Sequence, residues 1–120
     1  MDGPIAIYKC LCDELRLRIL NLLNHGPLCV CHIQEVLGES QVKVSKQLAY
    51  MKRLGLVVVT KRANWRIDSL PESASPLLRE NLKCLQDLAL EGGRFGADLK
   101  RLRTVDTGAA CFPVETSCCE

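Results

Sequence analysis

The chain has 120 residues, of which 48% are hydrophobic and 25% charged, and its formal net charge is +2. This size suits one compact domain with a modest core and excludes two ordinary domains. No apolar run approaches the roughly 20 residues of a membrane span, and the start MDGPIAIYKC lacks the features of a signal peptide. We therefore expect a cytoplasmic protein with no membrane partner.

The first part of the chain has the apolar spacing of two helices. Residues 5–11 carry one such pattern, and Asp13 is a suitable N-cap for a second helix. The second helix would bury Leu15, Ile19, Leu22 and Leu23. Its opposite face would present Arg16, Arg18 and Asn21. The turn at 25–27 ends this helix, because glycine tolerates a left-handed cap and proline cannot continue the hydrogen-bond ladder.

Two further helices follow in close succession. A short one is expected over 32–37 and is stopped by Gly38. Ser40 is a suitable N-cap for the next helix, which Gly55 closes. The inward side of that helix is predicted to consist of Val44, Leu48 and Met51, at i, i+4 and i+7.

The period then changes to that of strands. Residues 56–60 are a β-branched run, residues 61–64 are polar, and residues 65–68 alternate, which together predict a two-stranded hairpin. Pro71 ends the pair.

The remaining chain predicts a long helix, a short one and a tail. Ser75 and Pro76 are an N-cap and a first-turn proline, and the paired glycines at 92–93 break the helix. Its inward face is predicted to hold Leu78, Leu82, Leu85 and Ala89. A shorter amphipathic piece follows, and periodicity is lost from Thr104. We therefore expect a domain over 1–103 and a flexible, cysteine-bearing tail over 104–120.

This order of elements is typical of a winged helix-turn-helix. The predicted class is mainly α (α+β), in the order α-α-α-α-β-β-α with an extra C-terminal helix and an irregular tail. Helix-turn-helix units place their second helix in the major groove of DNA, and a hairpin wing can reach the neighbouring backbone.

The charge distribution supports DNA as the partner. Residues 41–67 carry seven lysines and arginines and no acidic residue, whereas the rest of the chain has nine basic and fourteen acidic residues, a net charge of −5. The whole basic excess thus lies on one predicted helix and one hairpin, as expected for a surface that meets phosphates.

A helical wheel gives candidate DNA contacts. With the apolar side inward, Lys43, Lys46, Tyr50 and Arg53 project from the far face. Lysines suit phosphates or guanine edges, and residues near the start of such a helix commonly contact bases. The expected contacts with double-stranded operator DNA are Gln41, Lys43, Ser45, Lys46, Gln47, Tyr50, Lys61 and Arg62. A solvated basic face is the alternative interpretation.

Eight cysteines are many for a chain of this length. Any one alone is expected in a core, where cysteine packs like a small hydrophobe, but clusters of thiols favour soft-metal binding or redox sensing. Cys29 and Cys31 form one cluster, just before the short helix. The tail has three cysteines within nine residues, which suit a soft-ion trap or belong to a passive end. The expected metal ligands are Cys29, Cys31, Cys111, Cys118 and Cys119.

Residues 5 to about 90 resemble the ArsR/SmtB family of metal-responsive winged-helix repressors, and most of all its arsenical-resistance repressors. The resemblance rests on IYKCLCDELRLRILNLL, LCVCHIQEVLGESQVKVSKQLAYMKRLGLV and TKRANWRIDSL. It implies a homodimer, joined through the first and the long C-terminal helices, that represses an operon until trivalent arsenic (arsenite) or antimony binds. It also implies that Gln41, Ser45 and Lys46 touch DNA.

Two positions depart from the family pattern. His32 stands where an aspartate usually follows the two cysteines, and Gln34 stands where arsenic-responsive relatives often have a third cysteine. A three-coordinate arsenite site would then need a thiolate from elsewhere. The candidates are Cys10, Cys12, Cys84 and the tail cysteines. Cys10 and Cys12 lie about 200° apart on a helix, so one ion cannot hold both without unwinding it. We assign Cys12 and Cys84 mainly to the core.

The same geometry suggests a mechanism and leaves alternatives open. Within a regular helix Cys29 and Cys31 would point to nearly opposite sides, so one ion holding both would unwind the helix start and displace the DNA-reading helix. A divalent soft metal such as cadmium, lead or zinc is an alternative effector, with His25 and His32 as further ligands. A thiol redox switch is another. An enzyme is not expected, because there is no CxxC, βαβ unit or Ser/His/Asp constellation.

Overall fold

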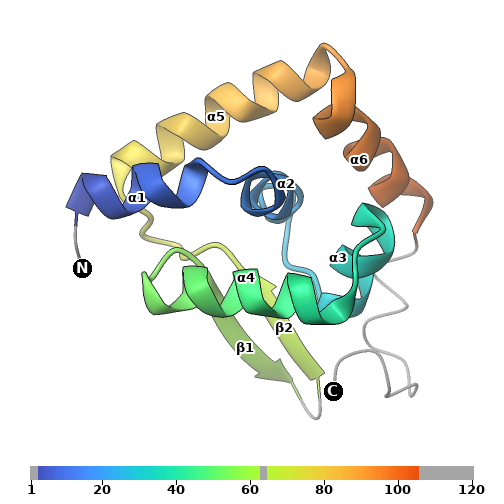
Figure 1. Ribbon diagram of the computed structural model, residues 1–120, viewed down its shortest axis with the longest axis horizontal. Coiled ribbons are helices and arrows are strands. Elements are labelled where there is room, and N and C mark those ends of the chain that lie inside the picture. The colour runs from blue at the N-terminus through green and yellow to red at the C-terminus, as the bar shows by residue number, and fades with distance from the viewer. Residues whose placement is uncertain (1–2, 63–64, 106–120) are drawn as a thin grey trace.

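The computed structural model describes residues 3–62 and 65–105, excluding the side chains of Arg62 and Trp65. These residues form six helices and a two-stranded hairpin (Figure 1). The elements are α1 (Gly3–Leu11), α2 (Glu14–Leu23), α3 (Val30–Leu37), α4 (Gln41–Arg53), β1 (Val58–Arg62), β2 (Trp65–Ser69), α5 (Pro76–Leu90) and α6 (Gly93–Thr104). The predicted mainly helical winged-helix order is confirmed. None of these helices is long and apolar enough to span a bilayer.

Local capping fixes most helix boundaries as predicted. The side chains of Asp13, Ser40 and Ser75 each accept a hydrogen bond from the backbone N–H three residues later. Gly38 ends α3 in the left-handed conformation, with a φ of 69°. α3 begins at Val30, two residues before the predicted start.

Helix α2 lies at the centre of the molecule, with the other helices around it (Figure 1). The expectation of a polar outer face is therefore wrong, because α6 covers Arg18 and Asn21 and Arg16 bonds to α1 and α4. Asn21 is fully buried, and its Nδ2 donates to the carbonyl of Phe95. Arg18 forms an ion pair with Asp98 of α6, at 2.8 Å between Nε and Oδ2.

The hairpin is antiparallel, with Val58 opposite Ser69 and Thr60 opposite Ile67. It begins two residues later than predicted, because residues 56 and 57 are buried in the core between α4 and β1. Leu28 adds an isolated bridge to the outer edge of β2, opposite Asp68. The wing is thus joined by its base to the segment that precedes α3.

Helix α6 folds back from α5 over α3 (Figure 1). The turn depends on Gly92 and Gly93, whose φ angles of 109° and 71° favour glycine. Arg101 near the end of α6 donates from Nη2 to the carbonyl of Glu35 in α3, at 2.9 Å. The predicted helix break is confirmed, and α6 holds α3 in place.

Candidate metal centre and nucleic-acid interface

A thiol and imidazole cluster lies at the start of α3. The Sγ of Cys29 is 2.9 Å from the Sγ of Cys31 and 3.2 Å from Nδ1 of His32. All three ligand atoms lie within 4.8 Å of one another. Among the residues that the structure describes, this is the one group of three or more side chains suited to hold a metal ion.

The position of Cys29 brings the two sulfurs together. Cys29 is the N-cap of α3, with an extended backbone (φ −91°, ψ 162°), and Cys31 lies in the first turn. The expectation that the two thiols point to opposite sides is therefore wrong, because it placed both inside a regular helix. One ion can meet both sulfurs without unwinding α3.

The cluster is enclosed on one side. Cys29 and His32 are buried, whereas Cys31 is half-buried. An ion would therefore enter past Cys31 into a site with little water. Two thiolates and an imidazole suit soft or borderline ions, and not hard cations such as Mg²⁺.

The other candidate cysteines that the structure describes do not join this cluster. Cys10 is fully buried, and burial raises the pKa of its thiol against the opposing influence of Arg16. Cys12 and Cys84 are exposed, so their assignment to the core is wrong. Cys12 follows the last residue of α1, and Cys84 lies on the outward side of α5. The tail cysteines 111, 118 and 119 lie outside the described residues.

Helix α4 has one buried face and one basic exposed face. Gln41, Lys43 and Lys46 are exposed, and Ser45 is half-buried toward the wing. Tyr50 does not project freely, as the wheel predicted, because the Arg16 guanidinium lies 4.3 Å from its ring centre. Arg16 also donates from Nη1 to Oε1 of Gln47, at 2.9 Å.

Two apolar residues of the exposed face were missed. Val42 is 71% exposed in the first turn of α4, and Ala49 is exposed two turns later. With Lys46 and Arg53 they form an outward ridge at i, i+4, i+7 and i+11. The predicted DNA contacts were all charged or polar side chains. A valine that lies off the apolar face of a basic helix nevertheless indicates an exposed apolar contact.

The family model for bacterial regulatory proteins of the arsR family matches residues 13–59. The arsenical resistance operon repressor of Escherichia coli K12 is 37% identical over 89 residues, which cover 70% of this chain and 76% of the relative. The chain belongs to the arsR family. The resemblance inferred from the sequence is confirmed, and the chain is a DNA-binding transcriptional repressor and not an enzyme.

Other relatives of this ArsR-family chain differ in what their names say they sense. The cadmium resistance regulatory protein CadC of Listeria innocua is 40% identical over 53 residues, or 43% of this chain and 44% of the relative. Among solved structures, HlyU of Vibrio cholerae N16961 superposes with a TM-score of 0.63 at 30% identity, covering 70% of this chain and 88% of HlyU. Together with the cluster, the arsenical-resistance and cadmium-resistance relatives support a metal or metalloid effector.

A buried carboxyl group lies where the wing of this ArsR-family chain meets α4. Asp68 is 1% exposed, and its Oδ2 has no hydrogen-bond partner among the described residues. Burial raises its pKa to about 6, against the opposing charges of Arg66 and Lys52. A cavity of about 280 Å³ lies beside it, between α4, the wing and Val30. Sequence reasoning treated Asp68 only as part of a strand pattern.

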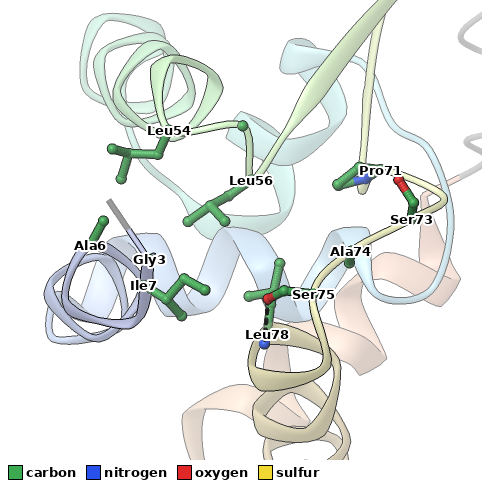
Figure 2. A pocket seen from close by; sticks show the side chains of 11 residues that line it. Gly3, Ala6, Ile7, Leu54, Leu56, Pro71, Ser73, Ala74, Ser75 and Leu78 are labelled. Carbon is green, nitrogen blue, oxygen red and sulfur yellow. Dashed lines mark hydrogen bonds between the residues drawn. The ribbon is translucent and has the colours of Figure 1, made fainter. Parts of the chain in front are cut away.

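A second pocket lies beyond the C-terminal end of α4, near the starts of α1 and α5 (Figure 2). Its volume is about 260 Å³. It is lined by Gly3, Ala6, Ile7, Leu54, Gly55, Leu56, Pro71, Ser73, Ala74, Ser75 and Leu78. None of these residues has a thiol, imidazole or charged side chain, so the pocket does not fit a metal or a phosphate.

Proposed function

We propose that this ArsR-family repressor responds to arsenite. It binds operator DNA as a homodimer in the cytoplasm and leaves the operator when trivalent arsenic or antimony binds Cys29 and Cys31. The observation that carries the proposal is the pair of sulfurs 2.9 Å apart at the start of α3, the helix that packs on α4. The arsenical-resistance relative supports the same effector.

The third ligand depends on the ion. Arsenite favours a third thiolate, for which Cys111, Cys118 and Cys119 of the tail remain our predicted ligands. A divalent ion such as cadmium, lead or zinc accepts mixed sulfur and nitrogen ligands, and Nδ1 of His32 lies 3.2 Å from Cys29 Sγ. This imidazole and the similarity to CadC favour divalent metal sensing as the second candidate function.

The DNA surface is proposed to be the outward face of α4 together with the wing. Lys43, Lys46 and Gln41 are exposed there, with Ser45 facing the wing. Lys61 and Arg62 of the wing would contact the DNA backbone. Gln47 and Tyr50 remain in the proposed interface, and the contacts with Arg16 give them a further role in fixing α4 on α2.

A homodimer is supported by apolar side chains on α1 and α5. Ile5 and Tyr8 of α1 are 63% and 51% exposed, and Leu88 of α5 is 52% exposed. The two helices contact each other. A second copy would cover them and place two α4 helices for a two-fold symmetric operator.

Effector binding would act through the start of α3. An ion that takes both sulfurs and the tail thiolate pulls on the N-cap of α3, and α3 packs against α4. By linkage, arsenite weakens operator binding by the same factor as operator weakens arsenite binding. The corresponding coupling free energy is commonly ~1–3 kcal/mol. Because a divalent metal displaces the thiol protons, release by cadmium or zinc should strengthen with rising pH, whereas the hydroxyl groups of arsenite leave as water with those protons.

Operator release in a fluorescence-anisotropy titration tests the function. Wild-type protein should leave the operator on addition of arsenite, and the Cys29→Ser and Cys31→Ser variants should bind the operator but ignore arsenite. Cys84→Ser is the matched control, since Cys84 is an exposed thiol outside the cluster. Parallel titrations with cadmium and zinc compare the two candidate functions. Normal release of Cys29→Ser by arsenite would contradict the proposal.

The short sulfur distance also favours a redox alternative. A peroxide could oxidise the two thiols to a disulfide, taking up their two electrons and two protons to form water. Mass spectrometry of the protein after mild peroxide treatment detects a loss of two hydrogens in the peptide that carries Cys29 and Cys31. Operator release by peroxide but not by arsenite would favour this switch.

A further inference from the structure

The wing is joined to the thiol cluster by two main-chain hydrogen bonds. The N–H of Leu28 donates to the carbonyl of Asp68 at 3.0 Å, and the N–H of Asp68 donates to the carbonyl of Leu28 at 2.8 Å. Leu28 directly precedes Cys29, whose carbonyl accepts the first hydrogen bonds of α3, from His32 and Ile33. A displacement of Cys29 therefore acts on α3 and on the wing at once.

The bridge uses backbone groups of Asp68 that the hairpin leaves available. In an antiparallel pair, hydrogen-bonded and non-hydrogen-bonded positions alternate. The backbone N–H and C=O of Asp68 both point toward Leu28. The pair formed by Val59 and Asp68 is therefore a non-hydrogen-bonded position of the hairpin. Breaking the bridge thus frees the base of the wing and leaves the ladder between β1 and β2 intact.

The surroundings of the bridge allow such a movement. The cavity beside Asp68 separates the base of the wing from Ser45 and Lys52 of α4. Within the described part of the chain, no group donates a hydrogen bond to the Oδ2 of Asp68 in this packed state. Asp68 lies three residues from the start of β2, so a tilt at the base moves the start of β2 over a lever of about 10 Å.

We propose that the Leu28–Asp68 bridge carries the effector signal from Cys29 to the wing. An ion that binds both sulfurs holds them farther apart than the present 2.9 Å, since metal–sulfur bonds of about 2.3 Å meet at a wide angle. This displacement of Cys29 rotates the backbone at Leu28, breaks the two hydrogen bonds and releases the wing from its position on DNA. This route runs beside the one through α3 to α4, and it rests on the proposed function of the cluster. Asp68 is a positioning residue in this scheme and does not touch the effector.

Amide hydrogen exchange of the DNA-free, full-length protein, followed by NMR, tests the bridge directly. Arsenite should speed the exchange of the Leu28 and Asp68 amides by at least about tenfold, as for bonds that open locally. Amides within α5 serve as the reference and should not change. Unchanged exchange at both bridge amides in a protein that arsenite releases from the operator would overturn the proposal.

A pair of proline variants tests the consequence for DNA. Asp68→Pro removes the N–H that bonds to Leu28 and keeps the hairpin ladder. Arg66→Pro is the matched control, because Arg66 occupies the next non-hydrogen-bonded position of the same strand, opposite Lys61. Asp68→Asn controls for the loss of the carboxylate. For each variant the measured quantity is the ratio of operator Kd with and without arsenite.

If the bridge carries the signal, Asp68→Pro should lower the ratio of the operator Kd with arsenite to that without arsenite, to less than about a third of the wild-type value. Arg66→Pro and Asp68→Asn should keep the ratio, and all three should still bind arsenite. An undiminished ratio in Asp68→Pro overturns the role of the bridge alone. A wild-type protein that arsenite does not release overturns the proposed effector and the bridge with it. The exchange measurement decides the matter if Asp68→Pro does not fold.

Discussion

His32 is the side chain that separates the two classes of effector. It is buried beside Cys29 and replaces the carboxylate expected after the two cysteines. A neutral imidazole nitrogen is a strong ligand for zinc or cadmium and a poor substitute for a thiolate toward arsenic. The identity of one residue thus bears on which ion the repressor senses.

We expect His32→Asn to affect divalent metals far more than arsenite. The amide preserves much of the side chain's volume and loses the imidazole donor, so the cadmium or zinc concentration needed for operator release should rise by about tenfold or more. The arsenite concentration should change by less than about threefold. Anisotropy titrations with each ion measure both values, and loss of the arsenite response alone would contradict the assignment.

Asp68 gives the fold a pH dependence of known sign. Its pKa in the folded state, about 6, lies above the ordinary value of 3.8. The folded protein therefore holds a proton that the unfolded chain has lost, and this contribution to stability is present at low pH and disappears as pH rises from about 4 to 6.

The Asp68→Asn variant should lack that dependence. Its free energy of unfolding should change less between pH 4 and 6 than that of the wild type, by about 2 kcal/mol. Urea unfolding across this pH range, followed by circular dichroism, measures the difference. Equal pH profiles for the two proteins would show that the carboxyl group is not buried as described.

Val42 is expected to read a thymine. Its exposed methyl groups lie in the first turn of α4, where an apolar contact with a thymine 5-methyl group is the ordinary match. Val42→Ala should weaken operator binding by about three- to tenfold, within the usual range for one base contact. An operator with deoxyuridine in place of thymine removes the same methyl group, and on that DNA the two proteins should bind alike. A persisting difference would place Val42 elsewhere.

At the scale of elements, local signals predicted where most helices begin and end. The contacts between elements far apart in the sequence depend on packing and were not predicted. The caps at Asp13, Ser40 and Ser75 could be predicted, because each side chain bonds to a backbone N–H three residues later. The surroundings of α2 could not be predicted, since the partner of Arg18 lies 80 residues away in α6. The two cysteines were predicted and their geometry was missed, because helical spacing was applied to Cys29, which has an extended backbone as the N-cap before α3.

The joint between α5 and α6 depends on close packing at Gly96. A Cβ placed there would lie 2.6 Å from the backbone oxygen of Ala89, which a side-chain movement cannot relieve. Gly96→Ala should therefore destabilise the fold by about 1–3 kcal/mol, even though alanine favours helix. Urea unfolding measures this loss. Ala97→Ser at the exposed neighbouring position should change stability by less than about 0.5 kcal/mol, and an equal loss there would contradict the packing argument.

At the scale of the whole molecule, two separate faces are proposed: one on α4 and the wing that binds DNA, and an apolar one on α1 and α5 that forms the dimer. Leu88→Glu should leave the fold intact and prevent pairing, because it buries an unpaired charge in the proposed dimer surface. The variant should be a monomer in light scattering and bind the operator at least about 100-fold more weakly. Ala97→Glu adds the same charge on α6 and should remain dimeric. A dimeric Leu88→Glu would move the interface away from α5.

The contact between Arg101 and Glu35 also fixes where the chain leaves the described domain. Val105 directly follows α6, four residues after Arg101, and Cys111 comes six residues later. Six extended residues span up to about 20 Å, whereas the eight residues of α3 are about 12 Å long. The linker to Cys111 is therefore long enough for the proposed third thiolate to come from the same subunit, in which case its supply would not depend on how much protein the cell contains.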